Sequence, residues 1–248
     1  MLAGTMLFVL LAGAALAALW LHPRLAPEYR TKETAEIVRL GFGVVATVAA
    51  LVLGLLISSV KSSFDQVTRE VQAGAAELVL TDRVLRQYGP AAEPARALLL
   101  RYTRRVLAES WPGRGATPVV DDQAAAALLD QAEAAILALP PDPRHPGLVE
   151  RAASDIRDVV RRRWLLVEES GSAVAPAVLV ALAVWLALIF ASFGFNAPRN
   201  RLVVAVLLAC AASVAGAVAL VVEMDGSFTG LVVVPSDAIE RALAHMQN

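Results

Sequence analysis

The chain has 248 residues, of which 57% are hydrophobic and only 18% are charged, and its formal net charge is −1. Soluble domains contain about half apolar and about a quarter charged residues, so this composition indicates an integral membrane protein. The near-neutral charge argues against nucleic acid as a partner, because nucleic acid attracts a basic surface. The single cysteine excludes an intrachain disulfide and any multi-cysteine metal site.

Four runs that lack any charged residue or histidine account for the excess of apolar residues. Each is long enough for a helix to cross about 30 Å of hydrocarbon, which takes about 20 residues. In lipid a spanning segment must satisfy its own backbone hydrogen bonds, so each run is predicted to be a helix. The runs are Leu2–Leu21, Leu40–Val60, Val174–Phe195 and Leu202–Val222.

The first run has an alternative interpretation as a cleaved signal peptide, because small residues lie near its end. Residues 1–6 carry no Lys or Arg, and the run is longer than the usual signal core of about 7–15 residues, so a retained span is favoured. Four crossings place both termini on the same side as the long segment between the second and third spans.

The segment 61–173 differs in kind from the spans, because it holds 15 of the 22 basic and 16 of the 23 acidic residues. Its apolar residues recur with a period near 3.6, which predicts helices outside the bilayer. The predicted organisation is two spans with a short charged connection (1–60), a helical extramembrane domain (61–173), two further spans (174–222) and a C-terminal segment with a short helix (223–248).

Four apolar stripes define the expected helices of segment 61–173, and the first and last are expected to continue the second and third spans. Asp121 and Asp122 suit the start of the third helix, and breaks are expected at Gly89-Pro90, 111–118 and 140–147. The stripes are Phe64, Val67, Val71, Ala75 and Leu78; Ala95, Leu98, Tyr102 and Val106; Leu128, Ala132, Ala135 and Leu139; and Leu148, Ala152, Ile156, Val159, Trp164 and Val167.

The connections carry further signals. Pro198 blocks helix continuation and Asn200 suits a helix cap, so the loop 196–200 is expected to be a structural hairpin; the alternative is a ring of arginines, Arg199 and Arg201, at a pore mouth. After the last span, residues 227–234 are expected to form a strand, followed by a helix capped by Ser236.

No motif for catalysis is present in the sequence. The histidines His22, His145 and His245 are far apart, and no pair has metal-ligand spacing on a helix. Cys210 lies within a span and is expected to be a small packing residue. We therefore expect neither an enzyme, nor a metal, nor a cofactor.

One face of the second span consists of small or hydroxylated side chains and ends in a lysine. Small residues at this spacing let helices pack closely in lipid, which the pattern alone favours, but the same face also suits the wall of a narrow pore in an oligomer. A similar face in the fourth span, at Ala209, Ser213, Gly216 and Ala219, supports packing for at least one of the two. The face comprises Gly43, Thr47, Ala50, Gly54, Ser58 and Lys61.

Several strings along the chain are similar to a known family. They are Glu33-Thr-Ala35 before Leu40-Gly-Phe-Gly43, Leu53-Gly-Leu-Leu-Ile57 leading into Lys61-Ser-Ser-Phe-Asp65, Phe190-Ala-Ser-Phe-Gly-Phe-Asn-Ala-Pro-Arg-Asn200, Ser213-Val-Ala-Gly216 and Glu223-Met-Asp-Gly-Ser-Phe-Thr-Gly-Leu231. With these strings the chain resembles the bestrophin-like family of bacterial four-span membrane proteins. The resemblance implies a relation to bestrophins, which are pentameric ion channels with a pore lined by the second span and a helical cytosolic domain.

The favoured hypothesis is a homo-oligomeric channel for small ions in the bacterial inner membrane. The alternative is a non-conducting membrane scaffold or sensor whose helical domain binds a protein partner. Orientation has two opposing signals. The short connections carry arginines and a lysine, which the positive-inside rule would place in the cytoplasm. The bestrophin resemblance instead implies a cytoplasmic helical domain with cytoplasmic termini, and that orientation is favoured.

Overall fold

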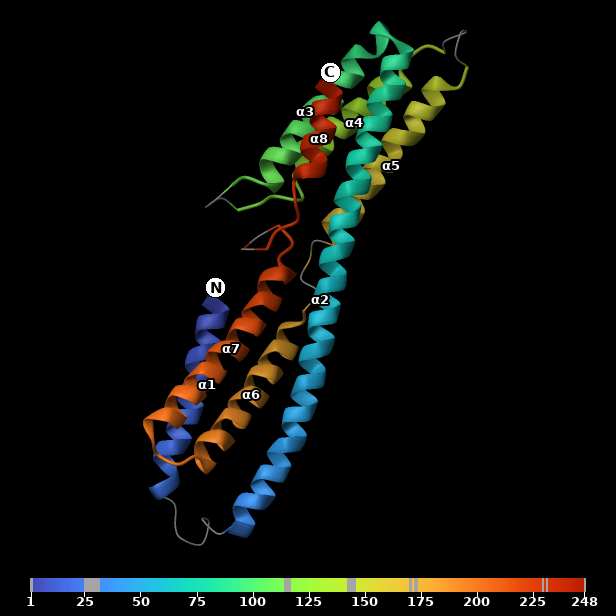
Figure 1. Ribbon diagram of the computed structural model, residues 1–248. Helices are drawn as coiled ribbons and strands as arrows, with labels where there is room; N and C mark the ends of the chain where they lie inside the picture. The colour runs from blue at the N-terminus through green and yellow to red at the C-terminus, as the bar shows by residue number, and fades with distance from the viewer. Residues whose placement is uncertain are drawn as a thin grey trace. The chain divides into compact units, whose positions relative to one another are not determined.

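The computed structural model of the chain describes residues 2–24, 32–113, 117–141, 146–169, 171, 174–228, 230 and 232–247. No strand occurs in these residues, and four of the helices, α1, α2, α6 and α7, are long and apolar enough to cross a membrane. The prediction of an all-α, four-span membrane protein is therefore confirmed. The helices are α1 (Leu2–Leu21), α2 (Lys32–Tyr88), α3 (Glu93–Ser110), α4 (Gln123–Leu137), α5 (Leu148–Glu169), α6 (Pro176–Asn196), α7 (Arg201–Asp225) and α8 (Asp237–Gln247) (Figure 1).

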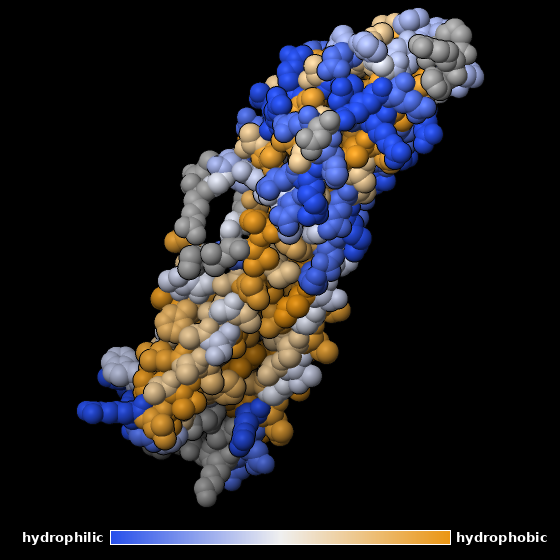
Figure 2. Space-filling view, turned by 45° about the horizontal axis from the view of Figure 1, so that its top comes forward, coloured by the Kyte–Doolittle hydropathy of each residue, from blue (hydrophilic) through white to orange (hydrophobic). Residues whose placement is uncertain are grey.

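The chain divides into two compact units, each built from segments distant in sequence. The membrane unit comprises Met1–Ser62 and Ser172–Asp225, and the helical unit comprises Ser63–Gly171 and Gly226–Asn248. Figure 2 shows hydrophobic side chains gathered over the helices of the membrane unit and mostly hydrophilic ones over the helical unit. This difference in surface is what contact with lipid and contact with water require.

Within the membrane unit, α1 packs along α6 and α7. Small residues bring the helix backbones close together, as in other helix contacts in lipid. A Cβ atom built on Gly4 would lie 2.6 Å from the Cβ of Ala219, and one built on Gly194 would lie 2.8 Å from the carbonyl carbon of Ala15. The buried residues of this core are Leu7, Leu11, Ala15, Ala49, Leu182, Leu186, Ile189, Phe190, Leu207, Ala211, Ala215 and Val218.

The connection between α6 and α7 is the expected hairpin. Asn200 caps α7, because its side-chain oxygen accepts a hydrogen bond of 2.8 Å from the amide of Val203. The Arg199 guanidinium donates to the carbonyl oxygens of Leu19 and Trp20, at 3.0 and 3.1 Å. These carbonyls belong to the last turn of α1, where the helix leaves them without intrahelical partners. The loop therefore joins three helices, in agreement with a structural role.

The two expected continuations of spans beyond the bilayer have different outcomes. α2 is one helix from Lys32 to Tyr88, so the second span does continue into the helical unit. The third span does not: α5 ends at Glu169 and α6 begins at Pro176. Proline has no amide hydrogen and would clash with the preceding turn inside a helix, so it occupies the first turn of α6 instead.

The helical unit has one apolar core, and its helices follow most of the predicted stripes. The stripes on α2 and α3 lie in this core, as expected. On α4 the predicted Ala132 is fully buried, and the predicted Leu128, Ala135 and Leu139 are partly buried beside the fully buried Ala125, Leu129 and Ile136. On α5 the prediction is wrong at Trp164, which is 58% exposed, because Arg163 takes the buried position and is only 8% exposed.

Where a strand was expected after α7, the described residues form a loop instead. Among the described residues of 227–234 there is no strand; the amide of Val234 donates to the carbonyl of Ser227 across 2.9 Å. Trp111 packs edge-on against Phe228 and donates its indole hydrogen to the Val234 carbonyl at 2.7 Å. Val234 is fully buried, so the end of this segment packs in a helical core rather than in a sheet.

Candidate functional site

In the membrane unit, α2 has a packed face and an uncovered face. Ala49 and Val60 are buried, and Val45, Leu53 and Leu56 pack beside them against the other helices. Only 6% of the residues in the most apolar stretch of α2 are buried, against 33% in α6. Most of this span therefore meets something other than its own chain.

The predicted face of small and hydroxylated residues lies on the uncovered side. Gly43, Thr47, Ala50, Gly54, Ser58 and Lys61 are all exposed. A Cβ atom built on Gly43 or on Gly54 would have no neighbour within 4 Å. The face is thus not a packing seam between helices of one chain, which leaves lipid, another copy or a water-filled pore as its neighbour.

The polarity of this face is weak at Thr47, because the Thr47 hydroxyl already donates its hydrogen bond within α2. The Thr47 hydroxyl donates to the Gly43 carbonyl four residues earlier, at 3.0 Å. Its oxygen still has lone pairs that can accept a hydrogen bond from the surroundings. On α7 the similar face divides: Ala219 packs against Gly4, whereas Ser213 is exposed and donates to the Ala209 carbonyl at 2.9 Å.

At the edge of this face, α2, α6 and α7 form a groove of about 990 Å³ within the membrane unit, and Gly43 belongs to both the face and the groove. Glu36 and Arg39 line it from the first turns of α2, and apolar walls come from Ile189 and Leu207. Cys210, expected to be a small packing residue, lines the groove and is exposed, so it is not packed within the core of its own chain. No pattern in the sequence indicates this groove, because it depends on the separation between helices.

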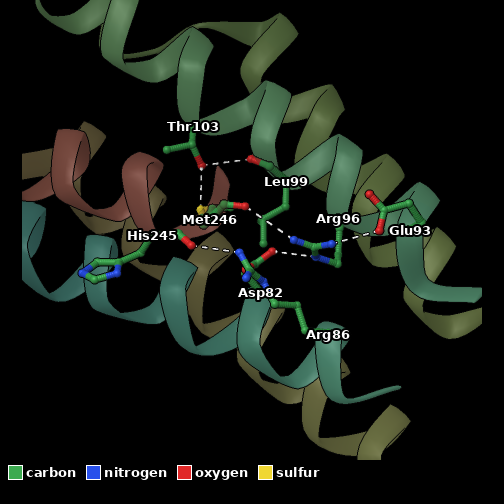
Figure 3. A network of polar contacts seen from close by, with 8 residues as sticks. All are labelled: Asp82, Arg86, Glu93, Arg96, Leu99, Thr103, His245 and Met246. Atoms are coloured by element: carbon green, nitrogen blue, oxygen red, sulfur yellow. Dashed lines mark hydrogen bonds and ion pairs between the residues drawn. The ribbon is translucent and has the colours of Figure 1, made fainter. Parts of the chain in front are cut away.

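The helical unit contains a buried ionic network that fixes the C-terminal helix (Figure 3). The Asp82 carboxylate is 3% exposed and accepts hydrogen bonds from the Nε atoms of Arg86 and Arg96, at 2.7 and 2.9 Å. The same two arginines reach the last turn of α8, where they donate to the carbonyls of His245 and Met246. Cations at a helix C-terminus satisfy free carbonyls and complement the helix dipole, so the network holds α8 against α2 and α3.

Further arginines of α5 pair with carboxylates of other helices. Arg162 contacts Glu70 at 3.1 Å and Glu77 at 3.2 Å, which ties α5 to α2. Arg163 donates to the carboxylate of Asp121 and to the backbone carbonyl of Asp122, at 3.1 and 3.0 Å. Buried charge in this unit is thus paired, as the cost of burying an isolated charge requires.

Asp122 starts α4 as predicted, since its carboxylate accepts a hydrogen bond of 3.0 Å from the Ala124 amide. A hydrogen bond from Arg105 holds the pKa of Asp122 below its usual value, against the opposing effect of burial. Burial raises the pKa of Tyr102 to about 12, while the nearby charge of Arg163 lowers it by less. Tyr102 lines a small cavity of about 40 Å³ inside this unit.

Within the described residues, no group of three or more His, Cys, Asp or Glu side chains is placed to hold a metal ion. His22 packs edge-on against Phe195, His245 lies on the exposed side of α8, and His145 falls outside the described residues.

A family model described as "Bestrophin-like domain" matches residues 9–239, which is nearly the whole chain. A crystal structure of a membrane protein is similar in fold, with a TM-score of 0.64 over 99% of both chains and 17% sequence identity. No curated protein sequence matches.

Proposed function

The chain belongs to the bestrophin-like family, and on that basis we propose that it is a homo-oligomeric ion channel whose pore is lined by α2. The uncovered small-residue face of α2 carries this proposal. A cyclic oligomer repeats every residue around its axis, so this face would form rings of Gly43, Thr47, Ala50, Gly54 and Ser58. A membrane helix that leaves such a face uncovered by its own chain is suited to an assembly.

The chemistry of the face suits a narrow, weakly polar conduit. Glycine and alanine positions leave room near the axis, and the hydroxyl oxygens of Thr47 and Ser58 can accept hydrogen bonds from water around a passing ion. Lys61 follows the span at its end and would place a ring of charge at one mouth. The uncharged wall between the mouths permits gating by dewetting.

The assembly and its location follow the resemblance to bestrophins. Five copies would surround the pore, with a multi-pass fold in the bacterial inner membrane. The helical unit and both termini would lie in the cytoplasm, where the helical unit would form the vestibule of the conduit.

Ion flux measured on purified protein in liposomes tests the proposal. Gly54→Leu adds a four-carbon side chain to each subunit on the proposed pore face and is expected to abolish flux while the oligomer persists. Gly41→Leu is the matched control: Gly41 is also exposed on α2, with no atom within 4 Å of an added Cβ, but it lies on the opposite side of the helix from Gly54. This control is expected to conduct at the wild-type rate.

Two results would contradict the proposal. One is a single-chain species by light scattering in detergent, which would exclude a pore between copies. The other is an oligomer that conducts normally with Gly54→Leu, which would move the pore away from this face. An oligomer that passes no ions in its wild-type form, and whose helical unit retains a soluble protein, would instead favour the scaffold or sensor.

A further inference from the structure

We propose that the groove between α2, α6 and α7 is a binding site for one zwitterionic phospholipid of the phosphatidylethanolamine type. The phosphate would lie at Arg39, the ammonium group at Glu36 and an acyl chain along the apolar walls. This site adjoins the proposed pore face and shares Gly43 with it, and its test does not depend on conduction.

The groove is shallow enough to lie within one leaflet of a bilayer. Its lining on α2 extends from Glu36 and Arg39, which precede the uncharged run, to Ala46, and its lining on α7 extends from Val206 to Cys210. At 1.5 Å per residue the helix rises about 10 Å from Arg39 to Ala46, which is less than half of the roughly 30 Å hydrocarbon core. A groove of this depth can hold the first part of the acyl chains of a lipid from one leaflet.

The mouth of the groove carries both charges of a zwitterionic headgroup. Glu36 and Arg39 are one helical turn apart and line the groove just before the uncharged run that begins at Leu40. Both are exposed, and neither forms an ion pair or side-chain hydrogen bond with the side chains that the structure describes. A guanidinium binds phosphate through charge-assisted hydrogen bonds, and a carboxylate accepts them from an ammonium group.

The walls of the groove offer apolar surface to an acyl chain. The larger apolar lining residues are Phe42, Ile189, Phe193, Val206 and Leu207, and small residues between them, Gly43, Ala46, Ser192, Ala197 and Cys210, leave the space that a chain can occupy. Phe193 and Val206 are about half exposed, so a flexible chain can follow their outline.

Native mass spectrometry of the full-length protein, extracted in a mild detergent and mixed with equal amounts of phosphatidylethanolamine and phosphatidylglycerol, tests the site. The wild type is expected to retain phosphatidylethanolamine in preference. Arg39→Gln is expected to lower this retention about ten-fold, through loss of a charge-assisted hydrogen bond. The matched control is Arg201→Gln, because Arg201 also lies at the end of a span but does not line this groove.

Two further variants separate the headgroup from the chain. Glu36→Gln is expected to abolish the preference between the two lipids while a lipid is still retained. Ala46→Phe fills the groove and is expected to reduce retention as strongly as Arg39→Gln. Val44→Phe is its control, since Val44 is 66% exposed and lies outside the groove.

Three outcomes would overturn the proposal. Equal retention of phosphatidylethanolamine by wild type, Arg39→Gln and Ala46→Phe would show that lipid does not occupy the groove. Equal or preferred retention of phosphatidylglycerol by the wild type would remove the role of Glu36. Dissociation of the oligomer by Ala46→Phe with unchanged lipid retention would assign the groove to a second copy.

Discussion

The membrane unit and the helical unit are stabilised by different kinds of contact. In the membrane unit, glycine brings backbones together, as at Gly194 beside Ala15, and the hydroxyls of Thr47 and Ser213 bond only within their own helices. In the helical unit, buried or half-buried charges link separate helices, as Asp82 does with Arg96. One chain thus uses steric fit where it meets lipid and ionic pairing where it meets water.

This contrast indicates where function is to be sought in each unit. In the helical unit, water weakens ionic contacts at the surface, so the buried ionic contacts are the ones that hold helices together. In lipid, an exposed apolar helix surface carries no hydrophobic cost. An uncovered surface of the membrane unit therefore has to be interpreted by its shape and by its few polar groups. The α2 face and the groove beside it are such surfaces.

The strongest test of the contrast is a methyl group added to a glycine in each unit. Gly194→Ala places a Cβ against the backbone of Ala15 and is expected to destabilise the membrane unit by about 3 kcal/mol or more, because two packed helices must separate. Gly74→Ala, in α2 within the helical unit, meets no atom within 4 Å and is expected to raise stability by about 1 kcal/mol. Thermal unfolding in detergent, followed by circular dichroism, measures both; equal effects would remove the contrast.

A second test concerns the buried arginine of α5. Arg163→Ala removes a buried side chain and two hydrogen bonds to the start of α4, and it is expected to cost about 2 kcal/mol. Trp164→Ala is the neighbouring control. It loses an exposed ring whose contact with the Arg163 guanidinium, at 5.4 Å, is expected to contribute about 0.5 kcal/mol. A larger loss of thermal stability in Trp164→Ala than in Arg163→Ala would show that Trp164, and not Arg163, occupies the core position.

A third test uses pH to separate a cap from a surface charge. Asp122→Ala removes the N-cap of α4 and is expected to cost about 1 kcal/mol at neutral pH. Because Arg105 holds the pKa of Asp122 below 3.8, the stability from the charged carboxylate is present above that value and is lost as pH falls through the lowered pKa. The difference from wild type should therefore be constant above about pH 5 and shrink below about pH 4.

Asp130→Ala is the control for that pH dependence, since Asp130 is exposed in the middle of α4. Its difference from wild type is expected to stay within about 0.5 kcal/mol at every pH. Asp155, whose pKa is raised by burial, acts in the opposite direction in the same unit, but it is present in both variants and cancels in the difference. A difference for Asp122→Ala that does not change with pH would show that the charge does not contribute to the cap.

Much of the fold was predictable from the sequence because lipid and helix ends impose strict local rules. The four spans follow from uncharged runs. Asp122 and Asn200 mark helix starts through their side-chain oxygens, and Gly89 marks a helix end through its positive φ. The faces of helices were harder. Between Ala124 and Leu129 every residue of α4 is apolar, so the period does not define which side is buried.

The errors share one physical cause, which is that burial depends on partners distant in sequence. Arg163 lies in the core position of α5 because Asp121 and Asp122 meet its guanidinium, and an apolar pattern assigns that position to Trp164 instead. The pairing of Arg96 with Asp82 and Met246 is equally non-local. On α2 the small-residue face was visible in sequence, but the groove that opens beside it was not, since its width depends on three separate helices.

The smallest expected effect concerns a buried hydroxyl in the helical unit. Tyr102 is 5% exposed, and its hydroxyl has no hydrogen-bond partner among the described residues, which makes it an exception to the paired polar groups of that unit. Tyr102→Phe is therefore expected to leave stability unchanged or to raise it by up to about 1 kcal/mol, because an unpaired group no longer has to be desolvated. Tyr88→Phe, which loses the bond from the Tyr88 hydroxyl to the Pro140 carbonyl, should instead cost about 0.5 kcal/mol. Alkali gives a second readout. Because burial raises the pKa of Tyr102 from 10 to about 12, the free energy of unfolding of the wild type is expected to fall as pH rises from 10 toward 12. Chemical unfolding of the full chain at pH 8 and pH 11 should show a smaller alkaline loss in Tyr102→Phe than in wild type, and an equal loss in both would place the hydroxyl in contact with water.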